Sequence, residues 1–351
     1  MREVVRAAQF ADGEFTVTEV ADPPALGPGQ VRIAVAACGI CGSDLSMSKD
    51  PCRFVAVAEK AGYPLAVFDP GRPVVLGHEY AGTVVETGSD VTDFVVGDRV
   101  AGIGVSTETG TGVPTIIGYS NEYHGGFGEF IVVDAFWVRH VPDGLSLEHA
   151  TLAEPLHVGE MHVQQSGLTA DDSALVIGCG PIGLGAILAA KAHGARTVIA
   201  SEPSPARRAL ARALGADIVV DPAEQDPVAV WNEQVAPGSG ILIAYECSGR
   251  PGILDSLLHT MPFGSRIQVL AAGFAEETIV PVVGQFRMIA INFGHGSYER
   301  AYDIVLRRLA DGEIDAEAII TGRVGLDGVA EAFRALRDPD DHVKILVLPH
   351  A

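Results

Sequence analysis

The sequence predicts an α/β fold of two domains, one of many short strands and one built on a doubly wound parallel sheet. Short alternating or apolar runs that end at turn residues fill residues 1–150, as in a β-barrel-like domain. Near residue 170 the pattern changes to apolar strands that alternate with helices, which is typical of βαβ units. The length of 351 residues fits a count of two at about 150 residues per domain.

In the first domain, strands are expected at VRIAVAA (31–37), GTVVETG (82–88) and GEFIVVD (128–134). Pairs such as Pro28-Gly29 mark tight turns between them, because Pro and Gly favour turn backbone conformations.

In the second domain, residues 174–195 and 197–216 share one plan: an apolar strand, a turn and an Ala-rich helix. Further strands are expected in DIVVD, ILIAYECSG and RIQVLAAGF. From about residue 297 the pattern is helical, and the chain ends on the strand-like run VKILVLP.

The composition excludes several classes of partner. Lys and Arg number 24 against 45 Asp and Glu, so the net charge of −21 repels nucleic acids and anionic lipids. The N-terminus lacks the apolar segment of a signal peptide, and no apolar stretch reaches the roughly 20 residues that cross a bilayer. Five cysteines are too few for a disulfide scaffold. We expect a cytoplasmic protein with a small-molecule substrate and neither nucleic-acid nor membrane partners.

A glycine-rich turn between a strand and a helix predicts a dinucleotide site. It has G-x-G-x-x-G spacing, and around Cys179 it consists of Gly178, Gly180, Pro181, Ile182 and Gly183. Glycines allow the tight turn and the close approach of a pyrophosphate to the helix N-terminus. The alternative is a glycine turn that binds no ligand.

Glu202 follows Gly183 by 19 residues, at the end of the next expected strand, where a carboxylate binds the ribose 2′-hydroxyl. A carboxylate there repels a 2′-phosphate, so NAD is favoured over NADP. Arg207 and Arg208 follow closely and can stack on adenine or reach a phosphate. The alternative for both arginines is an exposed charge on the next helix.

Three separate segments can supply the thiolate, imidazole and carboxylate of a zinc site, and they carry Cys38 and Cys41, then His78 and Glu79, then Glu154. Three protein ligands leave a fourth position open for substrate or water, as a catalytic zinc requires. Cys38 and Cys41 have C-x-x-C spacing, but no second such pair completes a four-cysteine structural site. The alternatives are a buried free thiol for either cysteine and a histidine in a turn for His78.

The chain carries six motifs in this order: CGICGSD (38–44), GHEYAGTVVETGS (77–89), GDRV (97–100), GGFGEF (125–130), AEPL (153–156) and GCGPIG (178–183). Together they resemble the zinc-dependent medium-chain dehydrogenases, the family of the alcohol, sorbitol and threonine dehydrogenases. The resemblance runs along the whole chain. It implies a GroES-like β-barrel-type catalytic domain over residues 1–155 and 295–351, and a Rossmann domain over residues 156–294. It also implies a homodimer or homotetramer.

The resemblance implies roles for individual residues. Cys41 and His78 match the family's zinc ligands, and Glu154 matches a third ligand in its polyol-dehydrogenase-like branch. Glu79 is either an alternative ligand or a group that supports the ligands. Ser43 passes the substrate proton toward the ribose and solvent. The remaining cysteines are then packing residues: Cys38, Cys52, Cys179 and Cys247.

The chain departs from the family pattern at two places. Many members have four cysteines between the GDRV and GGF motifs, whereas residues 101–124 contain none, so we expect one catalytic zinc and no structural zinc. Ser46 stands where many members carry a histidine that helps to move the proton to solvent. Ser46 can join a relay of hydroxyls and water, but it cannot act as a base near neutral pH.

A third departure is an insert at residues 47–75, which lengthens the separation of Cys41 and His78 and carries Phe54, Tyr63 and Phe68. It is either a surface excursion or subunit contact, or a cap over the substrate. A cap favours a substrate that is bulkier, more apolar or cyclic.

The function implied is zinc-dependent hydride transfer between NAD and a secondary alcohol or polyol-type hydroxyl, with ketone or aldehyde reduction as the reverse. One alternative is a zinc-free quinone- or enone-type reductase of the same superfamily. The other is a non-catalytic cofactor-binding protein.

Overall fold

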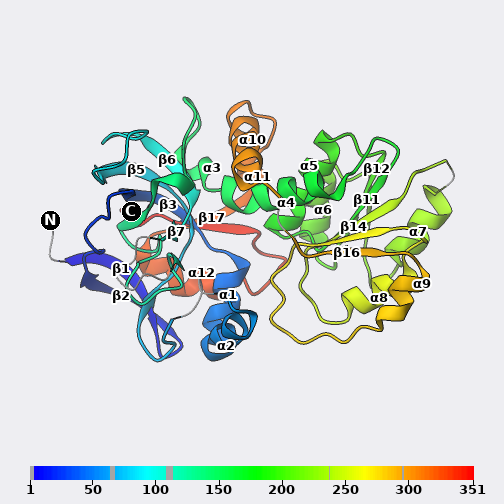
Figure 1. Ribbon diagram of the computed structural model, residues 1–351, viewed down its shortest axis with the longest axis horizontal. Helices are drawn as coiled ribbons and strands as arrows, with labels where there is room; N and C mark the ends of the chain where they lie inside the picture. Colours follow the sequence, from blue (N-terminus) through cyan, green and yellow to red (C-terminus); the bar gives the residue numbers. More distant parts are fainter. Residues whose placement is uncertain (1–3, 64–67, 108–113, 237, 295) are drawn as a thin grey trace. The chain divides into compact units, whose positions relative to one another are not determined.

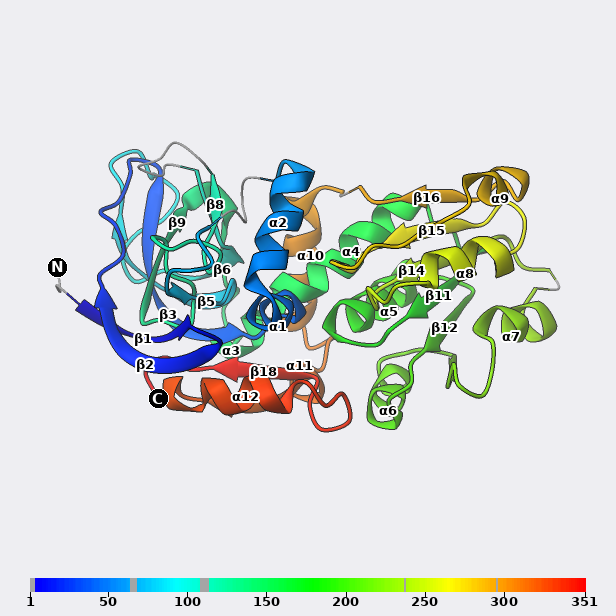
Figure 2. The same ribbon diagram turned by 90° about the horizontal axis from the view of Figure 1, so that it is seen from below.

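The computed structural model describes residues 4–63, 68–107, 114–236, 238–294 and 296–351. Its contacts divide the chain into two compact units, each drawn in Figures 1 and 2. The first unit comprises Met1–Glu154, Leu306–Asp338 and Lys344–Ala351. The second unit comprises Pro155–Val305 and Pro339–Val343. Among the described residues, no helix combines the length and the apolar character needed to span a membrane.

The first unit is built on a seven-stranded sheet with the order β10-β6-β5-β3-β18-β17, in which β9 also pairs with β3. A second sheet has the order β2-β1-β4, and β7 pairs with β8. The strands are β1 (Val4–Ala11), β2 (Glu14–Ala21), β3 (Gln30–Gly39), β4 (Val74–Val75), β5 (Glu79–Thr87), β6 (Arg99–Ile103), β7 (Val105–Ser106), β8 (Thr115–Ile116), β9 (Phe130–Asp134), β10 (Val138–His140), β17 (Ile320–Val324) and β18 (Lys344–Val347). The helices are α1 (Gly42–Lys49), α2 (Pro51–Ala61), η2 (Ala135–Trp137), α3 (Leu147–Ala150), α11 (Ala316–Ile319), η3 (Leu326–Gly328) and α12 (Val329–Ala335).

Strand β3 is the centre of this sheet. Its residues are almost all buried because it pairs with β5, β9 and β18. Antiparallel pairing sets the end of β3 beside the start of β5, with Gly39 opposite Glu79. Strand β18 runs antiparallel to the same end of β3, with Leu346 opposite Gly39. Three strand ends therefore meet at one edge.

The second unit contains one parallel sheet with the strand order β13-β12-β11-β14-β15-β16. This order is that of a doubly wound Rossmann sheet, in which ligands bind outside the carboxyl ends of the strands. The strands are β11 (Ser173–Ile177), β12 (Thr197–Ser201), β13 (Ile218–Val220), β14 (Leu242–Glu246), β15 (Arg266–Val269) and β16 (Ala290–Asn292). The helices are α5 (Pro181–Ala192), α6 (Pro205–Ala213), α7 (Pro227–Gln234), α8 (Ile253–Thr260) and α9 (Pro281–Phe286).

Helices cover both faces of the parallel sheet, so its central strands are apolar without alternation. On one face, Trp231 of α7 and Leu257 of α8 join a buried cluster with Leu175 and Ile199 of the sheet. Helix α5 lies on the opposite face, as Figure 1 shows. Two further helices, α4 (Ala153–Ser166) and α10 (Tyr298–Ala310), each contribute residues to both units.

The second unit includes residues 296–305 and 339–343, which the family resemblance placed in the catalytic domain. The start of α10 is held by ring contacts, with His157 of α4 lying 5.1 Å from Tyr298 and 5.4 Å from Tyr302 between centroids. Residues 339–343 are held by Ser204, whose hydroxyl donates to the Pro339 carbonyl at 3.2 Å. Contacts of this kind leave no periodic signal in the sequence.

The first half of the insert at residues 47–75 is helical, because α1 is followed directly by α2 (Figure 2). Asp50 begins α2 by accepting a hydrogen bond from the Arg53 amide at 3.0 Å. Phe54 of α2 packs against Phe68 and Tyr119, with ring centroids 6.4 and 4.8 Å apart. The insert is therefore packed onto the first unit through aromatic side chains; residues 64–67 of the insert lie outside the described residues.

The cysteine-free stretch is tied to the sheet by side-chain hydrogen bonds. Gln30 donates to Ser106 at 2.8 Å and to Asp134 at 3.1 Å. The backbone amide of Thr107 donates to the same Asp134 carboxylate at 2.8 Å.

Candidate functional site

The candidate metal ligands come from the meeting strand ends of the first unit. Cys41 follows β3 and begins helix α1, and His78 immediately precedes β5. Glu154 lies in the first turn of α4. The register of β3 and β5 brings the first two residues together although they stand far apart in the sequence.

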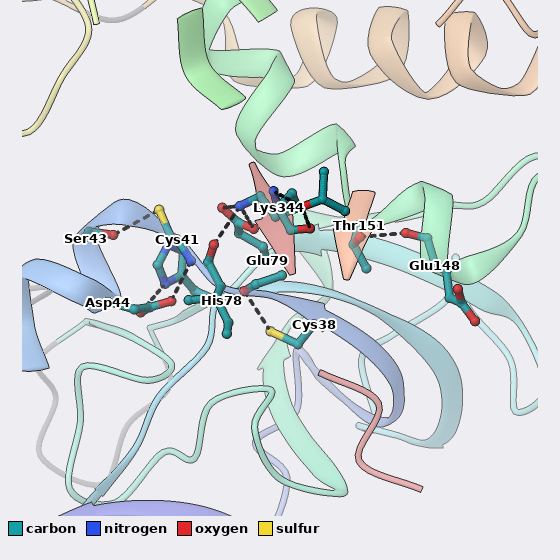
Figure 3. Close-up of polar contacts among 12 residues, drawn as sticks. Cys38, Cys41, Ser43, Asp44, His78, Glu79, Glu148, Thr151 and Lys344 are labelled. Atoms are coloured by element: carbon teal, nitrogen blue, oxygen red, sulfur yellow. Dashed lines mark hydrogen bonds and ion pairs between the residues drawn. The ribbon is translucent and has the colours of Figure 1, made fainter. Parts of the chain in front are cut away.

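His78 lies between Cys41 and Asp44 (Figure 3). Its Nδ1 is buried and 3.4 Å from Oδ1 of Asp44, whose other oxygen accepts the Cys41 amide at 3.0 Å. Burial acts to lower the pKa of His78, but the Asp44 carboxylate and the contact with Cys41 raise it well above its usual value. Asp44 faces the Nδ1 side of the ring, so Nε2 is the nitrogen that would bind a metal once it has lost its proton.

Glu154 is the third candidate metal ligand, and its surroundings shift its pKa. Burial raises the pKa of Glu154 to about 7, and the nearby His78 acts in the opposite direction. A cation that binds beside this carboxyl group favours its charged form, so the proton is released to solvent when the cation binds.

The residues present fit zinc by their chemistry. A thiol, a buried imidazole oriented by a carboxylate and a buried carboxyl group are the donors that zinc takes at catalytic sites. In the described part of the chain, no three His, Cys, Asp or Glu side chains lie close enough together to hold a metal ion as they stand. The fit rests on the donor set and on the Asp44–His78 contact.

Glu79 is engaged by Lys344, a residue that the sequence analysis missed. Both side chains are 1% exposed, and Nζ of Lys344 donates to the two Glu79 oxygens at 2.6 and 2.8 Å. The same Nζ donates to the Ile40 carbonyl at 2.8 Å. This arrangement favours the interpretation of Glu79 as a group that supports the ligands. A single lysine within the apolar run VKILVLP was the available signal.

The two serines of helix α1 lie in different surroundings. Ser43 donates to Sγ of Cys41 at 3.1 Å and accepts from the Tyr119 hydroxyl at 2.8 Å. Ser46 is exposed and donates to the Gly42 carbonyl of its own helix at 3.1 Å. The structure thus brings Tyr119, rather than Ser46, to Ser43. Burial, with Asp44 and Cys41 nearby, raises the pKa of Tyr119 well above its usual value, so its hydroxyl keeps its proton.

Cys38 is fully buried, and burial raises the pKa of its thiol well above the usual value. Its Sγ lies 2.9 and 2.6 Å from where side chains on Gly77 and Gly126 would begin. This close packing agrees with a role in the core.

The candidate cofactor site is a cavity of about 850 Å³ in the second unit. It opens at the carboxyl ends of β11, β12 and β14, where Gly178, Glu202 and Ser248 line it. A side chain on Gly183 would begin 1.9 Å from the Gly178 carbonyl oxygen, so only glycine permits this turn. A side chain on Gly180, at the start of α5, would meet only Nη1 of Arg207, at 3.9 Å, and Pro181 and Ile182 form the first helical turn behind it. This cradle fits a pyrophosphate at a helix N-terminus.

Glu202 is buried at the end of β12 and binds the turn itself. Its two oxygens accept the amides of Cys179 at 2.7 Å and Ser204 at 2.9 Å. Arg207 lines the cavity and donates to the His342 carbonyl at 3.2 Å, while its buried Nε has no hydrogen-bond partner. Arg208 instead pairs with Asp221 at 2.9 Å. Beside the glycine turn, the Glu202 carboxylate and the donor atoms of Arg207 are therefore available to a ligand.

Comparisons with known proteins agree with this geometry. Residues 27–143 match the family model of the alcohol dehydrogenase GroES-like domain, and residues 181–306 match that of the zinc-binding dehydrogenases. The chain is 34% identical to (R,R)-butanediol dehydrogenase of Bacillus subtilis, covering 99% of this chain and 100% of that protein. It is 30% identical to sorbitol dehydrogenase of the same organism, covering 99% and 98%. The crystal structure of 2R,3R-butanediol dehydrogenase from Bacillus subtilis superposes with a TM-score of 0.82 at 32% identity, covering 98% and 99%.

The Lys344–Glu79 pair generates a prediction about stability. Lys344→Met leaves the Glu79 carboxylate buried without its partner, and removal of one member of a buried ion pair costs about 3–5 kcal/mol. The free energy of unfolding, measured with urea on the metal-free protein, is expected to fall by that amount. The double variant Lys344→Met/Glu79→Gln leaves no lone charge and is expected to recover much of the loss.

The exposed pair Arg334–Glu331 supplies the control, because Arg334→Met removes an ion pair that water already screens. Equal losses for Lys344→Met and Arg334→Met, or strictly additive losses in the double variant, would contradict this account.

Proposed function

Because the chain belongs to the zinc-type medium-chain dehydrogenase family, we propose that it transfers a hydride between NAD and a secondary alcohol or polyol-type hydroxyl. Reduction of a ketone or aldehyde is the reverse reaction. The curated relatives named above are a butanediol and a sorbitol dehydrogenase, and both names describe hydroxyl-bearing substrates of this kind.

The observation that carries the proposal is the contact of Cys41 and His78 with their supporting groups; the half-buried Glu154 is the third candidate ligand. Asp44 orients the imidazole, and Ser43 donates to the thiol sulfur. The same chain holds a cavity at the strand ends of a Rossmann sheet, with a glycine cradle and a buried carboxylate. A protein with a purely structural role would need neither a metal site nor a cofactor cavity.

The residues divide the chemistry between them. A zinc ion held by Cys41, His78 and Glu154 supplies Lewis acidity toward the substrate oxygen. Ser43 relays the hydroxyl proton of the substrate: its Oγ accepts that proton while its own hydroxyl proton passes on toward the cofactor ribose and solvent. Glu79, paired with Lys344, keeps the segment before β5 in place. Hydride transfer itself is the chemistry of the nicotinamide ring.

We propose NAD as the cofactor on the strength of Glu202. Its carboxylate is buried at the end of β12, where the adenosine ribose of a dinucleotide binds. Each carboxylate oxygen accepts one backbone amide and retains a lone pair for a ribose hydroxyl. A 2′-phosphate at this position would meet a negative charge.

We also propose that the protein assembles with copies of itself along strand β16. Within the described residues, β16 is an edge strand that pairs with β15. Large apolar side chains are exposed on and near it: Phe263, Val280, Val282, Phe286, Met288 and Phe293. An exposed strand edge flanked by apolar side chains is a surface that another chain can cover.

Substitution of a zinc ligand tests the activity. Wild-type protein is expected to contain about one zinc per chain and to reduce NAD with 2,3-butanediol, sorbitol or another secondary alcohol of a panel. Cys41→Ser is expected to lose zinc and turnover together, since a thiolate ligand is removed. Cys52→Ser, which changes an exposed thiol of α2, is the control. Zinc and turnover retained in Cys41→Ser would refute the ligand assignment, and zinc-independent reduction of enones would favour the reductase.

Cofactor choice is tested at Glu202. Glu202→Gln keeps an acceptor for the turn and removes the charge, so the preference for NAD over NADP is expected to fall roughly tenfold, equivalent to 1.4 kcal/mol. The ratio of the two dissociation constants, measured by fluorescence, reports the change. Glu224→Gln removes an exposed charge that lines the same cavity and is the matched control. A ratio unaffected by Glu202→Gln would mean that Glu202 only supports the turn.

Assembly is tested at Phe286, which is 74% exposed. Light scattering coupled to size exclusion is expected to give a multiple of the 36.7 kDa chain mass for wild type. Phe286→Glu places a charge in the apolar surface and is expected to shift the mass toward that of one chain. Phe136→Glu, at a 63% exposed position of the first unit, is the control. If the wild-type protein has the mass of a single chain, the proposal of self-assembly is wrong.

A further inference from the structure

The turn that contains Tyr119 packs closely against the segment that contains His78. Gly118 has a φ of +85°, and a side chain there would begin 2.9 Å from the Gly77 amide nitrogen. The Gly126 amide donates to the Gly77 carbonyl at 2.7 Å from the other end of the same turn. These backbone contacts set the position of Tyr119 independently of its own side chain.

The Tyr119 side chain is buried between aromatic neighbours. Its ring centroid lies 5.3 Å from that of His78 and 4.8 Å from that of Phe54 in the insert helix α2. It is 4% exposed, so its hydroxyl depends on protein partners rather than on bulk water.

The hydroxyl of Tyr119 reaches two groups of helix α1. It lies 2.8 Å from Oγ of Ser43 and 3.1 Å from Oδ1 of Asp44, and it can donate its one proton to either. Oδ1 is also the oxygen that faces Nδ1 of His78. A donor at Oδ1 therefore restrains the carboxylate that orients the imidazole.

Donation to Ser43 has a second effect. A serine hydroxyl rotates freely about its C–O bond unless a partner occupies its oxygen. When Tyr119 occupies one lone pair of Ser43, the serine proton is directed at Sγ of Cys41, 3.1 Å away. Since the phenol has one proton, it makes one of these two hydrogen bonds at a time, and it restrains Ser43 in one arrangement and Asp44 in the other.

We propose that Tyr119 is a positioning residue for the metal ligands and for the proton of Ser43. It acts through Asp44 on His78 and through Ser43 on Cys41. In this chain a tyrosine from the cysteine-free stretch supplies the hydrogen bond to Ser43, while Ser46 bonds to its own helix. The kinetic part of this inference rests on the proposed function; the part that concerns zinc affinity does not.

Tyr119→Phe is the test, because it removes the hydroxyl and keeps the ring contacts with His78 and Phe54. Loss of a group that orients metal ligands weakens metal binding by about 10–100-fold, so zinc affinity is expected to fall roughly tenfold or more. Competition with a fluorescent zinc chelator measures it. On the zinc-loaded enzyme, kcat for the alcohol is expected to fall roughly tenfold, while KM for NAD changes by less than about twofold, because Ser43 loses the orientation of its proton.

Tyr245→Phe is the matched control. It removes an equally buried hydroxyl that bonds to Ser166 at 2.8 Å in the second unit, so it reproduces the loss of a buried hydrogen bond away from the ligands. Its zinc affinity is expected to equal that of wild type. Unchanged zinc affinity in Tyr119→Phe overturns the proposal, and so does an equal loss in Tyr245→Phe. If zinc affinity falls but no alcohol is oxidised by wild type, the proposed function fails and the positioning role stands.

Discussion

The ion pair between Lys344 and Glu79 is the constraint around which the first unit is arranged. A single ammonium group contacts Glu79, the neighbour of His78, and the carbonyl of Ile40, the neighbour of Cys41. Both segments are therefore held by the first residue of the last strand. A buried ammonium group must have several acceptors, and Lys344 has these acceptors in the register that sets Leu346 of β18 opposite Gly39 of β3.

The second unit reaches its site by a different route. Its strand order alone creates the crevice, since parallel strands with helices on both faces leave their carboxyl ends open. Polar atoms then refine it: Glu202 satisfies two amides of the turn region, and Ser204 and Arg207 hold residues 339–343 nearby. The cofactor site is thus built largely from backbone, whereas the metal site is built from side chains.

The contrast between a site built from backbone and a site built from side chains explains which residues the sequence could predict. The glycine turn, Cys41 and His78 stand in short motifs, because local backbone geometry and ligand chemistry restrict the residues there. Lys344 and Tyr119 stand in no motif. Lys344 meets Glu79 across 265 residues, and Tyr119 meets Ser43 across 76, so only the folded register joins them. The same limit applies to the ring contacts that place the start of α10 in the second unit.

The way in which the two units divide the chain limits how one unit can be replaced by that of a related protein. The boundaries fall after Glu154, Val305, Asp338 and Val343, so neither unit is one continuous stretch of chain. Two boundaries cut through the helices α4 and α10, and the last falls directly before Lys344. A chimaera that swaps one unit for a homologous one therefore needs four splice points. Recombination at a single point would always leave a unit with segments of mixed ancestry.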